Sequence, residues 1–370
     1  NRLGKNLWTQ KGAGEPIKLH AAQNDIEEAQ HIVNQVRNLK RQGLSFSEMA
    51  LLYRANAQSR ILEHTLFNAN VPYRVYGGLR FFERAEIKHA LAYLRLSAGI
   101  FDDNAVLRVI NFPTRGIGAK TIEMLQDAAQ IHNYPLMEAI RKNLVAGKAG
   151  QALNHFSELI DRLQLKISGL VLSEAIERVI AESSLYSFYE NEREGQDQLD
   201  NLNELINAAS LFQTESDTPT IHSFLAHASL EAGDYQTSST HSDSVQLMTI
   251  HAAKGLEFDT VFVSGLEEGL FPHDHSLHEK TALEEERRLM YVAMTRARQR
   301  LYLSYAQNRM LNNQRRYGIR SRFLDEIPEA LIQLTSVHQS LQHSGTRIAE
   351  SAVFPSANKE WTIGQNVIHP

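Results

Sequence analysis

Hydrophobic and polar positions follow three successive patterns along the chain. From residue 16 to about residue 78, short runs rich in β-branched and aromatic residues alternate with longer runs whose hydrophobic residues recur every three or four positions. This alternation predicts strands and helices in turn, and therefore a parallel sheet covered by helices. The predicted strands are 16–22, 49–55 and 72–78, and the predicted helices are 26–42 and 58–69.

The second pattern is typical of helices alone, and the third again alternates strand-like and helix-like runs. Helical periodicity dominates from Leu79 to about Ala232, and the alternation resumes near Val245. We therefore predict one α/β domain that is interrupted by an inserted helical domain. The returning elements are predicted strands at 244–252, 259–266 and 300–306, and a predicted helix at 284–299.

Composition narrows the possible classes of protein. The 370 residues include no cysteine, which excludes disulfides, thiolate metal sites, iron–sulfur clusters and cysteine nucleophiles. No apolar run approaches the roughly 20 residues that span a bilayer, and the first residues lack a signal-peptide pattern. We therefore expect a soluble, cytoplasmic protein. The net charge of −5 argues against a surface built wholly for polyanions but allows local basic patches.

Both ends of the sequence suggest a piece of a longer protein. It begins with Asn1 instead of methionine, and a new pattern starts near Trp361. Residues 329–370 are expected to be a linker and the start of a C-terminal extension. The segments 76–78 and 233–244 are expected to be flexible joints on either side of the helical insert, although such stretches are also common as surface turns.

The stretch TRGIGAKT, at 114–121, resembles the end of an ATP-binding phosphate loop. A phosphate loop has the pattern G-x-x-x-x-G-K-[ST], whereas Ala119 here separates Gly118 from Lys120. A helix is also predicted before it, at 105–113, where a phosphate loop follows a strand. The pattern instead predicts a helix-hairpin-helix, whose glycines and second helix can contact a DNA phosphate. The alternative is a turn between two helices that needs glycine only for its geometry.

Polar residues gather where the predicted strand 244–252 ends. They are Thr249, His251, Lys254 and Glu257. Open α/β sheets bind ligands at the carboxyl ends of their parallel strands, so this group is a candidate binding site. A single histidine is usually structural and a single lysine usually solvated, but four such groups beside a buried strand favour a functional role.

The predicted helix 284–299 carries a candidate phosphate-binding arginine. Its run 289–294 is hydrophobic all round and is expected to be buried, and Arg296 lies on the face of Leu289 and Ala293. An arginine on a buried face needs a partner, and its planar guanidinium binds phosphate oxygens in pairs. The alternative is an arginine that reaches solvent from the end of the helix.

One histidine cluster resembles a metal site. His273, His275 and His278 have zinc-like spacing, but they follow a loop without a predicted ordered scaffold. We therefore predict no metal ligands in this chain.

Six stretches resemble the motifs of the UvrD/PcrA/Rep family of superfamily 1 DNA helicases, in the family's order and spacing. They are LLYRANAQSRILE, YGGLRFFERAEIKHALAYLRL, TRGIGAKT, MTIHAAKGLEFDTVFVSGLEEGLFPH, EEERRLMYVAMTRARQRLYLSYA and SRFLDEIP. The resemblance covers nearly all of residues 1–328. It implies a RecA-like parallel-sheet subdomain without a P-loop, called 2A, at 1–77 and 246–328, and an inserted all-helical subdomain, called 2B, at 78–245.

The resemblance also implies roles for single residues. Arg296 matches the catalytic arginine that reaches the γ-phosphate of ATP from the opposite domain, and Glu257 matches the glutamate that binds the ribose. Matches to single-stranded DNA contacts are Arg54, Asn56, Thr249, His251 and Lys254. Matches to the loop that grips duplex DNA are Thr114, Arg115, Gly116, Ile117, Gly118, Lys120 and Thr121.

The implied function is that of the C-terminal half of an ATP-dependent 3′–5′ DNA helicase in nucleotide excision and mismatch repair. Its implied partners are single-stranded DNA, 3′-tailed duplex DNA, repair loading proteins and the N-terminal half of the same protein. The implied cofactors are ATP and Mg²⁺, but the family's Walker A loop and magnesium ligands are absent from this sequence. The chain alone is therefore expected not to hydrolyse ATP. The alternative is a standalone DNA-binding or interaction module without motor activity.

Overall fold

The computed structural model describes residues 14–193, 195–233, 243–277, 279–311 and 314–335. Within these residues one eight-stranded sheet has the order β3-β4-β2-β5-β6-β1-β8, and β7 pairs with β6 beside this path. All the strand pairs are parallel except β6 with β7. The strands are β1 Ile17–Asn24, β2 Met49–Tyr53, β3 Tyr73–Val75, β4 Val245–Thr249, β5 Phe258–Val263, β6 Ala297–Leu311, β7 Gln314–Tyr317 and β8 Ile332–Leu334.

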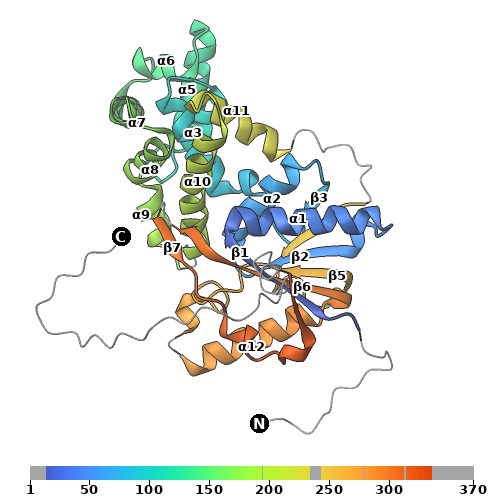
Figure 1. Cartoon of the computed structure of the whole chain (residues 1–370). Helices are drawn as coiled ribbons and strands as arrows, with labels where there is room; N and C mark the ends of the chain where they lie inside the picture. The colour runs from blue at the N-terminus through green and yellow to red at the C-terminus, as the bar shows by residue number, and fades with distance from the viewer. Residues whose placement is uncertain (1–13, 194, 234–242, 278, 312–313, 336–370) are drawn as a thin grey trace, which may run out of the picture. The chain divides into compact units, whose positions relative to one another are not determined.

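Helices cover both faces of this sheet. Figure 1 shows α1 (Asp25–Arg41) and α2 (Ser59–Asn68) on one side, and α12 (Lys280–Met294) on the other. Alternate residues of a strand point to opposite faces. In β2, Leu51 packs into the cluster with α1 and α2, whereas Leu52 packs into the cluster with α12. The uninterrupted hydrophobic run of β2 follows from this burial on both faces.

The first helix shows why the sequence folds locally as predicted. The Asn24 side chain accepts a hydrogen bond from the Glu27 N–H at 2.8 Å and so caps the helix N-terminus. Acidic residues occupy the first turn and basic residues the last, which complements the helix dipole. The buried hydrophobic residues recur at helical spacing: Ala29, Ile32, Val33, Val36 and Leu39.

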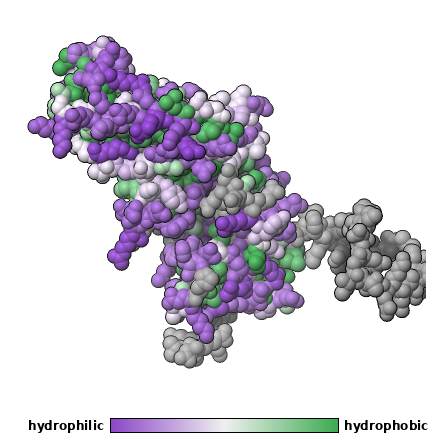
Figure 2. All heavy atoms as spheres, turned by 90° about the vertical axis from the view of Figure 1, so that its left-hand side faces the viewer, coloured by the Kyte–Doolittle hydropathy of each residue, from purple (hydrophilic) through white to green (hydrophobic). Residues whose placement is uncertain are grey.

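The segment between β3 and β4 is helical and has its own hydrophobic cluster, separate from the two on the sheet. Its helices bury one stripe each, and the face of this region in Figure 2 is mostly hydrophilic with scattered hydrophobic groups. The helices are α3 Ala85–Ser97, α4 Asp103–Val109, α5 Ala119–His132, α6 Leu136–Arg141, α7 Gly147–Ile167, α8 Leu172–Glu182, α9 Leu185–Glu190, α10 Gln196–Glu215 and α11 Ile221–Ala232. No helix in the described part of the chain is long and apolar enough to cross a membrane.

The predicted fold class is confirmed, since the sheet is parallel apart from the pair of β6 with β7, is flanked by helices, and has only helices among the described residues between β3 and β4. Two predicted helices are too long. The helix at 105–113 ends at Val109, because the Asn111 side chain accepts hydrogen bonds from the N–H groups of Arg115 and Ile117 and turns the chain. The helix at 284–299 ends at Met294, because pairing with β5 extends the following residues.

The expectation that the run 289–294 is wholly buried is wrong at Tyr291, which is 50% exposed. The helix lies on one face of the sheet only, so its outer side meets solvent. The sheet also continues beyond residue 328, because β8 pairs with β1 inside the segment expected to be a linker. Residues 336–370, and 234–242 of the second expected joint, lie outside the described residues.

A buried ion-pair group joins β6 to the helix and loop beside it. The Arg309 guanidinium donates to Glu28 at 2.5 Å and to Glu267 at 2.7 Å, and each of the three is less than 9% exposed. Burial alone would lower the pKa of Arg309, but the adjacent Glu267 and Glu28 carboxylates raise it well above its ordinary value. The group therefore remains charged in the interior.

A second buried polar group lies where the helical segment leaves the sheet. Arg84 donates to the Ser59 hydroxyl and to the Asn201 side-chain oxygen, both at 2.7 Å. Asn201 in turn donates to Glu86 at 2.6 Å. These contacts connect α2, the start of α3 and α10, and so fix α3 and α10 of the insert against the residues that follow β2.

Candidate functional site

The candidate residues separate onto two opposite edges of the sheet. Thr249 ends β4 and Arg54 follows β2, so both lie at the carboxyl edge of these parallel strands. Glu257 directly precedes β5 and Arg296 directly precedes β6, which places both at the amino edge. The prediction that Glu257 shares the strand end with Thr249 is therefore wrong. A connection between parallel strands must cross from one edge of the sheet to the other, and Glu257 stands at the end of that crossing.

Arg296 lies against the end of α12 at the amino edge. Its guanidinium donates to the carbonyl of Val292 at 3.0 Å and to the carbonyl of Leu256 at 2.8 Å. It also donates to the Thr295 hydroxyl at 3.1 Å. The Arg296 carbonyl accepts from the Phe258 N–H at 2.9 Å, which ties the residue to β5. Within the described residues its hydrogen-bond partners are neutral, so the positive charge remains available to an anion.

Glu257 is exposed beside Arg296, and its own ion pair is loose. Its carboxylate lies 3.6 Å from the Arg298 side chain, which also approaches Glu48 at 3.4 Å and Asp259 at 3.6 Å. Arg298 and Glu257 are both highly exposed, so these pairs contribute little stability. A ligand can therefore replace them at small cost.

Arg54 at the carboxyl edge is held by a carboxylate that the sequence reasoning missed. It makes paired hydrogen bonds to Glu286 of α12, at 2.7 to 3.1 Å, and Glu286 is only 3% exposed. The Glu286 carboxylate also accepts from the His273 N–H at 3.3 Å. A signal was present in the sequence, because Glu286 stands three residues before Leu289 and seven before Ala293, on the buried face of the helix.

The other residues at this edge are less constrained. The Asn56 side chain donates to Asp197 at 3.0 Å, whereas His251 and Lys254 are exposed. Loss of hydration around the His251 ring lowers the pKa of His251, and the nearby positive charge of Arg54 lowers it further. Its ring is therefore mostly neutral at pH 7 and acts as a hydrogen-bonding group, while Lys254 and Arg54 carry the positive charge.

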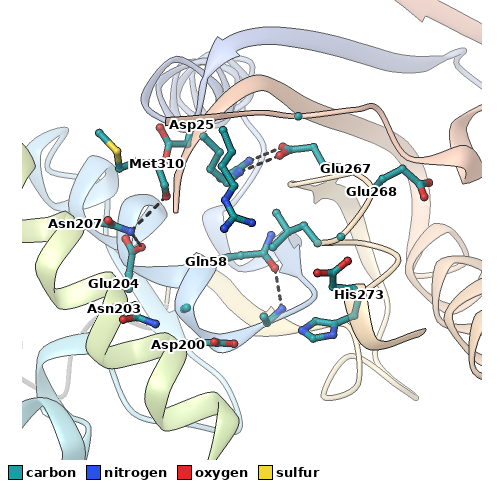
Figure 3. Close-up of a pocket in the computed structure, with 18 of the residues that line it drawn as sticks. Asp25, Gln58, Asp200, Asn203, Glu204, Asn207, Glu267, Glu268, His273 and Met310 are labelled. Atoms are coloured by element: carbon teal, nitrogen blue, oxygen red, sulfur yellow. Dashed lines mark hydrogen bonds and ion pairs between the residues drawn. The ribbon is translucent and has the colours of Figure 1, made fainter. Parts of the chain in front are cut away.

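A cavity of about 430 Å³ opens beside these residues, between the loops at the carboxyl edge and α10. Figure 3 shows Glu267 and Glu268 on one side and Asp200 and Glu204 of α10 on the other. Arginines pair with three of these carboxylates: Arg309 with Glu267, Arg322 with Glu268 and Arg60 with Glu204. Gln58 lies in it and accepts hydrogen bonds from the N–H groups of Arg54 and the next residue, at 2.9 and 2.8 Å. It therefore fixes the turn that carries Arg54.

The loop 114–121, which includes the first turn of α5, follows α4 in the helical region, and only part of it faces outward. Ile117 is fully buried, and the Arg115 guanidinium donates to the backbone carbonyls of Val109, Pro113 and Ser183. The side chains of these two predicted duplex-binding residues are therefore turned into the protein. They anchor the loop, and any contact with DNA at these positions would come from the backbone.

The outward residues of the loop suit a close contact with a phosphate. Thr114, Gly116, Gly118 and Lys120 are exposed, and Thr121 is partly so. Gly116 has a φ of +74°, which favours glycine. At Gly118, which caps α5, an added Cβ would meet no atom within 4 Å. The fold itself therefore leaves open space at the start of α5, where helix N–H groups attract anions.

Comparison with protein families identifies the family of a chain with this fold and these residues. Residues 1–308 match the UvrD-like helicase C-terminal domain. The chain belongs to this family. The match includes both parts of the sheet and the helical segment between them.

Several curated relatives of this UvrD-like domain are DNA helicases. The chain is 44% identical to DNA helicase II of Escherichia coli over 383 residues, which cover 100% of the chain and 52% of the relative. It is 41% identical over 380 residues to DNA helicase II of Haemophilus influenzae, with coverage of 100% and 52%. It is 38% identical over 344 residues to the ATP-dependent DNA helicase PcrA of Bacillus subtilis, with coverage of 90% and 46%. The chain thus spans about half the length of these relatives.

Proposed function

We propose that this UvrD-like domain forms the second half of the ATP cleft and part of the DNA track in an ATP-dependent 3′–5′ DNA helicase that acts in DNA repair. The observation that carries the proposal is the position of Arg296 and Glu257 at the amino edge of a sheet whose opposite edge carries Arg54, Thr249 and Lys254. One sheet therefore offers separate surfaces for a nucleotide and for a nucleic acid. The relatives named DNA helicases support the same assignment.

The residues at the amino edge have the chemistry to contact a phosphate and the ribose of a bound ATP. Arg296 offers a guanidinium whose present partners are neutral carbonyls and a hydroxyl, which a phosphate oxygen can replace. Glu257 is exposed and can accept hydrogen bonds from ribose hydroxyls. The sequence contains no G-x-x-x-x-G-K-[ST] loop, so the cradle for the phosphates and the ligands for Mg²⁺ must come from another segment of a longer protein.

The residues at the carboxyl edge fit the backbone of single-stranded DNA. Lys254 and Arg54 supply charge for phosphates, while Asn56, Thr249 and the neutral His251 supply hydrogen-bonding groups. Glu286 already binds Arg54, so a phosphate there would share the guanidinium with a carboxylate. Arg54 therefore positions the strand, and the exposed Lys254 contributes the larger share of the salt-dependent attraction.

The limits of the parts are also proposed. Residues 1–77 and 246–328 correspond to subdomain 2A, to which the structure adds β8, and residues 78–245 correspond to subdomain 2B. The relatives are bacterial proteins named for their action on DNA, so a cytoplasmic location accompanies the proposal.

The test of the proposal is ATP hydrolysis by the chain alone and by a longer protein that contains a phosphate-loop segment. The chain alone should show no DNA-stimulated ATP hydrolysis, because nothing in its sequence can hold the β- and γ-phosphates. The longer protein should hydrolyse ATP and unwind a duplex with a 3′ tail. DNA-stimulated hydrolysis by the chain alone, or none by the longer protein, would contradict the proposal. In the second case DNA binding by both would favour a module without motor activity.

The loop 114–121 gives a prediction for duplex DNA. The chain should bind a 3′-tailed duplex with an affinity that falls as salt rises, and Lys120→Ala should lower the slope of log K against log [salt] by about 0.9. Replacing Gly116 and Gly118 together by valine should weaken duplex binding, because branched side chains would fill the space open to a phosphate. Fluorescence anisotropy at several salt concentrations measures both effects.

The matched control for this prediction is Gly169→Val. Gly169 also has a positive φ, +79°, and open space around its Cβ position, but it lies in the turn between α7 and α8. It should cost similar stability, on the order of 1–2 kcal/mol, and leave duplex binding unchanged. Equal binding by the loop variant and the parent protein would show that the loop does not contact the duplex.

A further inference from the structure

Three potential metal ligands meet where α2 approaches α11. His64 of α2 and Glu231 of α11 are both at least nine-tenths buried, and His227 lies one turn before Glu231 on the same helix. One carboxylate oxygen of Glu231 lies 2.6 Å from His64 Nδ1 and 2.8 Å from His227 Nε2. The three ligand atoms all lie within 4.8 Å of one another. Two imidazoles and one carboxylate thus converge on one point.

The carboxylate of this cluster is enclosed by the protein. Glu231 is 5% exposed, and one of its oxygens contacts both histidines. A carboxylate buried in this way needs a cation or hydrogen-bond donors as partners. A metal ion between the two histidines and Glu231 would supply the cation.

The outer nitrogen of His64 has a carboxylate within reach. Its Nε2 lies 3.2 Å from a carboxylate oxygen of Glu215 and 3.1 Å from the Asn68 side-chain nitrogen. Because the Asn68 amide nitrogen donates and the Glu231 carboxylate accepts, the ring proton lies on Nδ1 in this structure. A histidine that binds a metal commonly donates its other ring N–H to a carboxylate. A metal at Nδ1 would therefore move the ring proton to Nε2, where Glu215 can accept it.

We propose that His64, His227 and Glu231 form a binding site for a divalent transition metal of the Zn²⁺ type. Zn²⁺ binds nitrogen and carboxylate oxygen at about 2.0–2.1 Å, which separates neighbouring tetrahedral ligands by roughly 3.4 Å. The present 2.6 and 2.8 Å separations therefore need to open by less than about 1 Å. On binding, the ring nitrogens that now face Glu231 would bind the metal, and each neutral ring would keep its one proton on its other nitrogen. His227 is partly exposed, so water can occupy the fourth position.

This site is independent of the proposed ATP chemistry. Mg²⁺ prefers oxygen ligands in octahedral geometry, whereas two imidazoles with one carboxylate favour Zn²⁺ and its neighbours. His64 and Glu231 stand 167 positions apart in the sequence. A bound metal would join α2, which packs on the sheet, to α11, the last helix of the insert. This proposal departs from the sequence prediction of no metal ligands, because His64 meets His227 and Glu231 only through the tertiary fold.

The test is titration of the metal-free 370-residue chain with Zn²⁺ against a chromophoric chelator, and with Co²⁺ followed by its visible absorption. One Zn²⁺ should bind per chain, and Co²⁺ should give the intense bands of a four-coordinate site. Replacing a ligand by glutamine, as in His227→Gln or His64→Gln, should weaken Zn²⁺ affinity by more than 100-fold. Glu215→Gln should weaken it by about 10- to 100-fold, as is typical of a residue that orients a ligand.

The matched control is His222→Gln on the same helix, where the histidine is exposed. It should leave the affinity and the Co²⁺ spectrum unchanged. Because glutamine can still donate to Glu231, His227→Gln should remain folded, and melting of the metal-free variant followed by circular dichroism checks this. If the parent chain bound no Zn²⁺, gave only the weak Co²⁺ bands of a hydrated ion, or lost as much affinity in His222→Gln as in His227→Gln, the site would be disproved.

Discussion

Replacing Arg296 by alanine in the longer helicase that we propose should slow ATP hydrolysis by on the order of 10³- to 10⁵-fold. An arginine brought to the γ-phosphate from the opposite domain stabilises charge that develops in the transition state, and the neighbouring Arg298 is engaged by Glu48, Glu257 and Asp259. Affinity for single-stranded DNA should change little, because the candidate DNA contacts lie at the carboxyl edge. Steady-state ATP hydrolysis and anisotropy binding on the same preparation measure both quantities.

The control for this substitution is Arg288→Ala on the same helix. Arg288 is exposed and pairs only with its neighbour Glu285 in the described structure, so its loss should leave hydrolysis unchanged. Arg296→Lys separates charge from geometry, because lysine keeps the charge but lacks the planar group whose separate nitrogens donate to Val292 and Leu256. A normal kcat in Arg296→Ala, with the fold intact, would remove Arg296 from the catalytic role.

Replacing Arg309 by methionine should lower the free energy of unfolding by about 3–5 kcal/mol. The substitution removes the cation and leaves the carboxylates of Glu28 and Glu267 buried together without a partner. Denaturant titration followed by circular dichroism gives the change. Because the group joins β6 to α1, the loss should appear in the sheet region.

Arg322→Met is the matched control for this stability prediction. Arg322 also makes paired hydrogen bonds to a glutamate, Glu268, but its side chain is 45% exposed. Water screens such a pair, so the cost should be about 0–1 kcal/mol. Similar losses for the two variants would mean that burial does not set the strength of the Arg309 group.

The sequence predicted the sheet and the helices well because their patterns are local. Residues 49–53 are hydrophobic throughout, as is typical of a short strand buried on both faces. Helix ends were harder to predict, since Asn111 and the pairing of Ala297 with β5 stop helices that local periodicity would continue. β8 was missed because three residues carry too little pattern to be recognised.

The candidate site was predictable in its residue types but not in its partners. The sequence singled out Arg54, yet its contact with Glu286 joins residues 232 positions apart, which no local pattern reveals. Arg115 and Ile117 were expected to face DNA, but both side chains serve the packing of their own loop. Residues that meet through the tertiary fold, as in the His64 cluster, lie beyond what spacing alone can indicate.

The ion pair of Arg54 with Glu286 makes α12 a link between the two edges of the sheet. From Glu286 to Met294 the chain is one uninterrupted helix, which spans about 12 Å at the rise of an α-helix. One end of this rigid segment holds the guanidinium that follows β2, and the other end leads directly into Arg296. In the proposed motor, a nucleotide that displaces Arg296 would also displace α12, whose Glu286 binds Arg54. Force could thus pass from one edge of the sheet to the other through a single element, without bending the strands between them.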